Sequence, residues 1–133
     1  MKIFFDNNLA PGLAESLKPV LSKEHEVSHL REKFPTNTPD AEWLSALAKE
    51  GGWIVISGDI GISRKPHEQK AWLESGLVVF FLSKGWTNIS PLIQLSKLAK
   101  ILPRVIETAQ NARGEKGFII TPSSNKIDPI TVT

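Results

Sequence analysis

The chain has 133 residues, of which 41% are hydrophobic and 23% charged, as is typical of a single soluble globular domain. Lysine and arginine exceed aspartate and glutamate by two, which is too small an excess to indicate nucleic-acid binding from net charge alone. The chain has no cysteine, which excludes disulfides and thiolate metal sites. The longest apolar run, residues 77–82, is too short to span a bilayer. The stretch before Asp6 leaves no room for a secretory signal, so we expect a cytosolic protein without membrane contact.

Apolar runs and helical periodicity predict that strands and helices alternate along the chain. Apolar runs without alternation are typical of strands buried on both faces. Proline at position 19 should kink the first helix or end it near Lys18, and Thr38 resembles a helix N-cap. In chain order we predict a strand at 3–5, a helix over 9–21, a half-exposed edge strand at 26–30, a helix over 39–50, a strand from 53, a mobile loop at 60–63, a helix over 66–76, a strand at 77–82, a helical segment over 88–111 kinked at Pro103, and a strand at 117–121.

This alternation predicts an α/β fold with a doubly wound parallel sheet and right-handed crossovers. We expect one three-layer domain over residues 1–121, with a mostly parallel five-stranded sheet in the order 2-1-3-4-5. Residues 122–133 are expected to form a polar tail, with an added edge strand at 130–132. In this order the first and third strands are neighbours, so the residues that follow them should meet in one crevice at the carboxyl ends of the strands.

Carboxylates occupy that crevice in the predicted topology. Asp6 follows the first strand and Asp59 follows the third. Asp40 continues the apolar stripe of its helix and should point to the same edge of the sheet, whereas Glu42 is rotated away toward water. Three carboxylates this close need a cation between them, and oxygen ligands select Mg²⁺ or Mn²⁺, the usual ions for phosphodiester hydrolysis. The alternative for each acid is an ordinary role at a helix start.

Three motifs resemble those of the PIN-like ribonuclease domains, and the likeness covers most of the chain, from Met1 to about Trp86. Within that family it is nearest to the short group of toxins from toxin–antitoxin pairs. The resemblance implies a metal-dependent endoribonuclease that acts on RNA, is commonly a homodimer and is inhibited by an antitoxin protein. The motifs are Asp6-Asn7-Asn8-Leu9 after the first strand, Pro39-Asp40-Ala41-Glu42 at the start of a helix, and Val55-Ile56-Ser57-Gly58-Asp59.

The resemblance also implies roles for particular residues. Two positions differ from the family pattern: Asn7 replaces a common glutamate, and Gly61 stands where a fourth acidic residue often follows. These differences favour a second interpretation, a silent PIN-like module that binds RNA or a protein partner. A third interpretation, a phosphatase-like or nucleotide-binding enzyme, lacks a glycine-rich phosphate loop. The implied roles are metal binding and catalysis for Asp6, Asp40 and Asp59, and support for Asn8, Ser57 and Glu42.

Basic residues follow the third motif. Arg64, Lys65 and Lys70 would lie beside the crevice and could position RNA phosphates, although a solvated helix start explains them equally well. Farther along, Lys97, Lys100 and Arg104 share one face of the last helix, a pattern more often explained by solvation.

Four aromatic and imidazole side chains complete the prediction. Trp43 and Trp86 are expected at an interface, or stacked on a base. His25 and His29 flank the edge strand and are expected at the surface.

Overall fold

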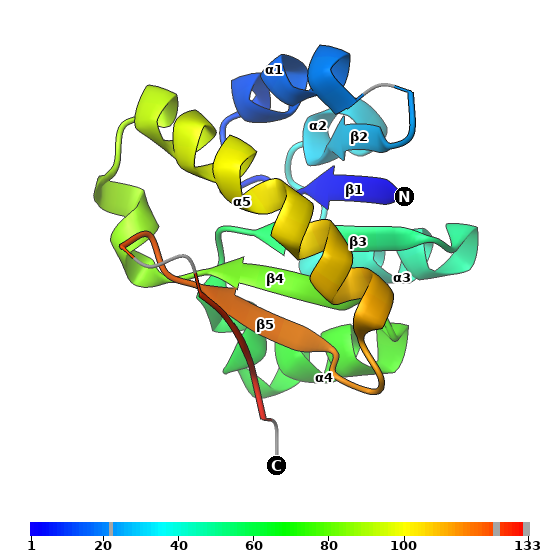
Figure 1. Ribbon diagram of the computed structural model, residues 1–133. Coiled ribbons are helices and arrows are strands. Elements are labelled where there is room, and N and C mark those ends of the chain that lie inside the picture. The colour runs from blue at the N-terminus through cyan, green and yellow to red at the C-terminus, as the bar shows by residue number, and fades with distance from the viewer. Residues whose placement is uncertain (22, 124–125, 132–133) are drawn as a thin grey trace.

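The computed structural model describes residues 1–21, 23–123 and 126–131. One central sheet is covered by helices on both faces (Figure 1), which confirms the predicted three-layer α/β fold. The strands are β1 (Lys2–Phe5), β2 (Glu26–His29), β3 (Trp53–Ser57), β4 (Val78–Leu82), β5 (Gly117–Ile120) and β6 (Ile127–Pro129). The helices are α1 (Pro11–Leu21), α2 (Leu30–Lys33), α3 (Asp40–Glu50), α4 (Pro66–Ser75) and α5 (Pro91–Asn111), with short 3-10 segments η1 (Ile60–Ser63) and η2 (Lys84–Asn88).

The strand order is β2-β1-β3-β4-β5-β6. The first five strands are parallel, and their order is the predicted one. The sheet has six strands rather than five, because β6 pairs antiparallel with β5.

The added strand was predicted at 130–132 and lies three residues earlier, at Ile127–Pro129. Ile127 pairs with Ile120 and packs against the core, so burial beside β5 determined the register rather than the β-branched run at 130–132. Pro129 is tolerated because the outer side of an edge strand needs no N–H donor. Residue 132 of the predicted strand lies outside the described residues.

Alternate side chains of the buried strands enter two separate cores. Phe5 and Ile56 join the core beneath α1 and α5, while Phe4 and Val55 join the core beneath α3 and α4. Successive side chains of a strand point to opposite faces of the sheet. This arrangement explains why these strands are apolar at nearly every position.

Helix α1 continues through Pro19 to Leu21, so the second of the two predicted alternatives, an end near Lys18, was wrong. Pro19 lies in the last turn, where the loss of one N–H donor interrupts little further helix. Pro103 also lies inside its helix, and α5 continues to Asn111. The predicted loop at 60–63 is instead the 3-10 segment η1.

The N-cap of α3 is Pro39 rather than Thr38. The Thr38 hydroxyl donates instead to the carbonyl of Pro35, at 2.7 Å. His29 was expected at the surface but is completely buried. Its Nδ1 accepts the N–H of Arg31, and its Nε2 lies 2.7 Å from the carbonyl of Leu9. Capping of α2 and this contact hold the imidazole inside the fold.

Trp43 and Trp86 are also core residues, with exposed fractions of 1% and 3%, so the expectation of an interface or a stacked base was wrong for both. Each buried indole N–H has an acceptor. Trp86 Nε1 donates to the carbonyl of Ile120 at 2.9 Å, and Trp43 Nε1 donates to Asp40. Within the described ranges, no helix is both long and apolar enough to cross a membrane.

Candidate metal centre

Four segments meet near the carboxyl ends of β1 and β3. Asp6 follows β1 and Asp59 follows β3, and the two strands are direct neighbours. The N–H of Asp6 donates to the carbonyl of Ile56 at 3.2 Å, which extends the pairing to the end of the strands. Helices α3 and α4 lie side by side on one face of the sheet and begin near this edge (Figure 1). The predicted meeting of the strand ends is therefore present.

Three carboxylates form a compact cluster here, which we call the acidic cluster: Asp40, Asp59 and Glu68. One oxygen from each lies within 4.8 Å of the others. All three residues are partly buried. The cluster joins the start of α3, the end of β3 and the first turn of α4. It is therefore assembled from segments that are distant in sequence.

Glu68 was not predicted as a site residue. The available signal was an acidic residue in the first turn of the helix that follows the third motif, a position that normally indicates only interaction with the helix dipole. One of its carboxylate oxygens, Oε2, is buried and has no hydrogen-bond partner within the described part of the chain. A buried carboxylate oxygen without a donor is costly unless a cation or a donor approaches it.

Asp40 shows the electrostatic effect of this crowding. Burial raises the pKa of Asp40, and the nearby charges of Glu68 and Asp59 raise it further. The hydrogen bond from Trp43 Nε1 to Asp40 Oδ1, at 3.0 Å, and the charge of Lys65 act in the opposite direction. Partly buried carboxylates with no other strong ligand type suit a hard divalent cation. The residues present therefore fit Mg²⁺ or Mn²⁺.

Asp6 lies behind the cluster and is only 3% exposed. Its Oδ1 accepts the N–H groups of Gly58 at 3.1 Å and Asn8 at 3.2 Å, and its Oδ2 accepts the Ser57 hydroxyl. Burial raises the pKa of Asp6 to about 6, against the lowering effect of these hydrogen bonds. Asp6 is near enough for the charge of Asp40 to contribute to that rise, but it is not one of the three clustered carboxylates.

The buried Ser57 hydroxyl links the two strand ends. It donates to Asp6 Oδ2 and accepts the N–H of Asp59 at 3.0 Å. Asn8 acts through its main chain, because its N–H reaches Asp6 while the residue is exposed. A Cβ at Gly58 would lie 3.0 Å from Asn8 Cβ, so glycine allows these two segments to approach closely.

The two positions that differ from the family pattern have structural roles. Asp59 Oδ1 accepts the N–H of Gly61 at 2.9 Å and caps η1. A Cβ at Gly61 would lie 2.8 Å from that same oxygen, so a side chain there would disturb the cap. Asn7 accepts from Arg31 Nε at 2.9 Å and donates to the carbonyl of Thr36 at 3.1 Å. Asn7 therefore joins the β1 end to the segment before α3.

The remaining predicted residues lie around the cluster. Glu42 is exposed and is not a member of it. Lys65 is near enough for its charge to lower the pKa of Asp40. Arg64 is exposed, and Lys70 Nζ pairs with Glu74 at 3.9 Å along the exposed side of α4.

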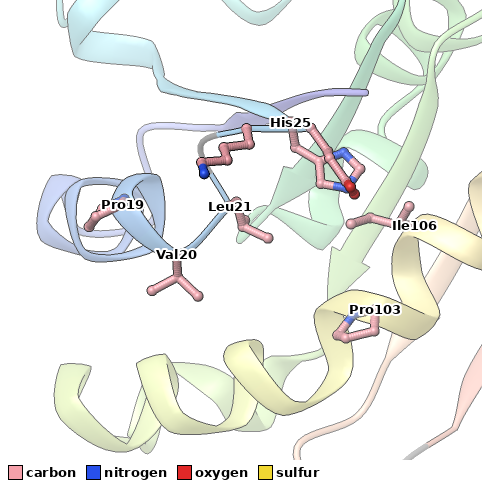
Figure 2. Close-up of a pocket in the computed structure, with 8 residues that line it drawn as sticks. Pro19, Val20, Leu21, His25, Pro103 and Ile106 are labelled. Atoms are coloured by element: carbon pink, nitrogen blue, oxygen red, sulfur yellow. The ribbon is translucent and has the colours of Figure 1, made fainter.

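A larger cavity of about 640 Å³ lies elsewhere, between the end of α1 and the middle of α5. In Figure 2, Val20 and Leu21 lie on one side of it, and Pro103 and Ile106 lie on the α5 side. None of the clustered carboxylates lines it. This cavity and the acidic cluster are thus separate features.

Comparison with protein families gives a match to the model described as "PIN like domain" over residues 1–84. No curated protein and no solved structure matches the chain. The matched region contains all four segments that meet at the acidic cluster, and PIN-like domains are generally nucleases. The match spans more than half of the chain and carries the predicted fold, and on these grounds the chain belongs to the family of PIN-like domains.

Proposed function

We propose that this protein is a divalent-metal-dependent endoribonuclease. The observation that carries the proposal is the convergence of Asp40, Asp59 and Glu68 within 4.8 Å, at the strand ends of a PIN-like domain. The resemblance of its motifs to the short toxin group extends the proposal to a toxin held by an antitoxin protein, acting as a homodimer in the cytosol.

The clustered carboxylates would hold Mg²⁺ or Mn²⁺. Once bound, such an ion supplies a more acidic water and neutralises charge on the phosphate oxygens. Asp40 is oriented for this role by Trp43 Nε1, and Asp59 is oriented by the N–H of Gly61. Asp6, although predicted as a ligand, is proposed to hold the Ser57 hydroxyl and the Gly58 turn in place.

Basic residues beside the cluster would bind the substrate. Lys65 is the best supported, because its charge acts on Asp40 and its Cε lies 3.5 Å from the Cβ position of Gly61. Arg64, directly before Lys65, and Lys70, in α4, are both exposed. These cations would attract the phosphates of RNA toward the acids.

One observation favours the alternative of a silent module that binds RNA or a protein partner. Both oxygens of Asp6 already accept hydrogen bonds from the protein, so the cluster retains three carboxylates rather than four. A site of this kind would bind metal weakly. Metal binding and RNA cleavage must therefore be measured separately.

The test uses Asp59→Asn and Glu68→Gln. Asparagine keeps an oxygen for the Gly61 N–H, so the η1 cap should survive while the charge is lost. We expect each variant to weaken Mn²⁺ binding in calorimetry and to lower cleavage of single-stranded RNA by roughly a hundredfold or more. The matched control is Glu26→Gln, which removes an exposed carboxylate at the start of β2, at the opposite edge of the sheet from the cluster, and should change neither quantity.

The outcomes separate the candidates. Undiminished RNA cleavage by both variants would show that the proposal of a nuclease site at the acidic cluster is wrong. Weak or absent Mn²⁺ binding by the wild-type protein, together with no RNA cleavage, would select the silent module. Hydrolysis of small phosphate esters without RNA cleavage would select the phosphatase-like enzyme.

A further inference from the structure

A second, smaller cavity of about 220 Å³ lies at the same edge of the sheet as the acidic cluster. One wall is a stripe of α5 that includes Ser96, Lys97 and Lys100. The opposite wall comes from Trp86 in η2, directly after β4, and from Pro122, directly after β5. Both walls therefore flank the carboxyl ends of β4 and β5. We call this cavity the lysine pocket.

Its walls are fixed by specific contacts. Trp86 Nε1 donates to the carbonyl of Ile120 at 2.9 Å, and Gln94 Nε2 donates to the carbonyl of Trp86 at 2.8 Å. Lys97 Nζ donates to the carbonyl of Pro122 at 2.9 Å. A Cβ at Gly85 would lie 3.1 Å from Pro122 Cγ. The pocket is thus built by contacts between η2, α5 and the segment after β5.

The charge of the pocket has one sign. Lys97 and Lys100 line it, and no acidic side chain among the described residues does so. Ser96 adds a hydroxyl, while Trp86 and Ile101 supply apolar surface. Its volume equals that of roughly seven waters, which is room for a phosphate group with part of its sugar. Ammonium and hydroxyl donors are suitable ligands for phosphate oxygens.

The pocket and the acidic cluster lie at the same edge of the sheet, the pocket beside α5 and the cluster beside α3 and α4 on the other face. Asp59 follows β3, and the pocket flanks β5, two strands away in the sheet. Two strand spacings are roughly 10 Å. The exposed Lys84 begins η2 at the end of the intervening strand β4. Basic side chains thus follow this edge of the sheet from Lys65 through Lys84 to the pocket.

We propose that the lysine pocket binds a backbone phosphate of a nucleic-acid strand that places another of its phosphodiesters at the acidic cluster. The inference rests on the proposed function for the substrate class. Its residues lie at 86–122, beyond the region that matches the family. Nucleotides that flank the cleaved bond would be held by this pocket, near the end of β5.

The test measures binding without cleavage, by fluorescence anisotropy in EDTA, with single-stranded oligonucleotides of about 12 nucleotides. Lys100→Glu should weaken RNA binding about tenfold, and Lys100→Gln should reduce the salt slope by about one. Ser96→Trp, a neutral change at an exposed helix position, should fill the pocket and weaken binding similarly. The matched control is Lys49→Glu at the end of α3, toward the opposite edge of the sheet, which should change affinity less than about twofold.

Either of two results with the variants would overturn the proposed pocket: equal weakening by Lys49→Glu and Lys100→Glu, which indicates diffuse charge attraction, or unchanged binding in both Lys100→Glu and Ser96→Trp. Failure of the wild-type protein to bind RNA or DNA would also overturn it. A DNA strand of the same sequence reports whether the pocket needs the 2′-hydroxyl.

A failure of the proposed nuclease function can be distinguished from a failure of the proposed pocket. If RNA is not cleaved with Mn²⁺ but Lys100→Glu still weakens RNA binding in EDTA, the proposed pocket is supported and the proposed nuclease function is wrong. If cleavage occurs, Lys100→Glu should raise the KM of a long RNA more than that of an RNA dinucleotide, because the single phosphodiester of a dinucleotide cannot occupy the acidic cluster and the pocket at once.

Discussion

Asp6 combines near-complete burial with three hydrogen bonds from the protein. Burial alone would keep its carboxyl group neutral over much of the acidic range, and the hydrogen bonds oppose this effect. The result is a pKa of about 6, against an ordinary value of 3.8. The folded protein therefore binds this proton more tightly than the unfolded chain does.

The direction of the pH effect follows from linkage. Because the folded-state pKa is raised, ionisation of Asp6 destabilises the fold as pH rises from about 4 through about 6, and the cost is fully present above that range. Asp6→Asn does not ionise. In EDTA, we expect the free energy of unfolding of Asp6→Asn minus that of wild type to increase by about 2 kcal/mol from about pH 4 to about pH 7.5.

Urea denaturation at the two pH values measures this difference, and subtraction of the wild-type values removes the titration of other groups. The matched control is Asp128→Asn, which removes an exposed aspartate charge on β6. A relative stability of Asp6→Asn that stays constant with pH would contradict the raised pKa.

The sequence contained enough information to place Asp6 and Asp59 together, because each follows an apolar run and parallel strands in this order are neighbours. It did not reveal Glu68. That residue reaches the cluster only because α4 packs beside α3, and helix packing angles are not written in local periodicity. His29 was missed for a similar reason: its buried partner, the carbonyl of Leu9, is 20 residues away.

At the scale of elements, β5 approaches α4 very closely. A Cβ at Gly117 would lie 2.5 Å from Trp72 Cζ2, and the indole cannot move freely because its Nε1 lies within hydrogen-bond distance of the carbonyls of Leu77 and Lys116. Trp72 also packs edge-on against Phe81, with ring centroids 5.2 Å apart. Glycine at position 117 is what lets the strand lie against this ring.

Gly117→Ala should therefore lower the free energy of unfolding by about 1–3 kcal/mol through overpacking. The same change at Gly12, in the exposed first turn of α1, meets nothing within 4 Å and should be neutral or stabilising by up to about 1 kcal/mol. Urea denaturation of both variants checks the contrast. Equal stability of the two variants would show that β5 can shift away from Trp72.

The long apolar strands were predictable as elements, because burial on both faces gives them a continuous apolar pattern. The short pieces were not. Helix α2 depends on capping by His29 and Glu32, and η1 depends on capping by Asp59. Such elements are specified by individual hydrogen bonds rather than by periodicity. The same is true of the N-cap at Pro39, where a loop contact held Thr38 elsewhere.

At the scale of the whole molecule, β6 covers the edge of the sheet next to β5. It pairs through three residues, and the N–H of Ile130 continues the contact by donating to the carbonyl of Gly117 at 2.8 Å. Most of β6 is exposed. Its main contribution is to occupy the backbone groups of β5, which would otherwise form an open edge.

Deletion of residues 123–133 should lower the free energy of unfolding by about 1–2 kcal/mol and promote association through β5. Binding of Mn²⁺ should persist, because the acidic cluster is built from the end of β3 and the starts of α3 and α4. Urea denaturation, light scattering and calorimetry test these expectations. Loss of Mn²⁺ binding in a truncated protein that remains folded would show that the tail supports the site.

The Ser57 hydroxyl has a further consequence for the molecule. It bonds to Asp6 on one side and to the backbone N–H of Asp59 on the other. These hydrogen bonds hold the ends of β1 and β3 together. Under the proposed function, a cation that binds Asp59 would meet a carboxylate already held in place, so little conformational entropy would be lost on binding. Ser57→Ala would keep every acidic group in the chain but remove the hydroxyl that links the ends of β1 and β3.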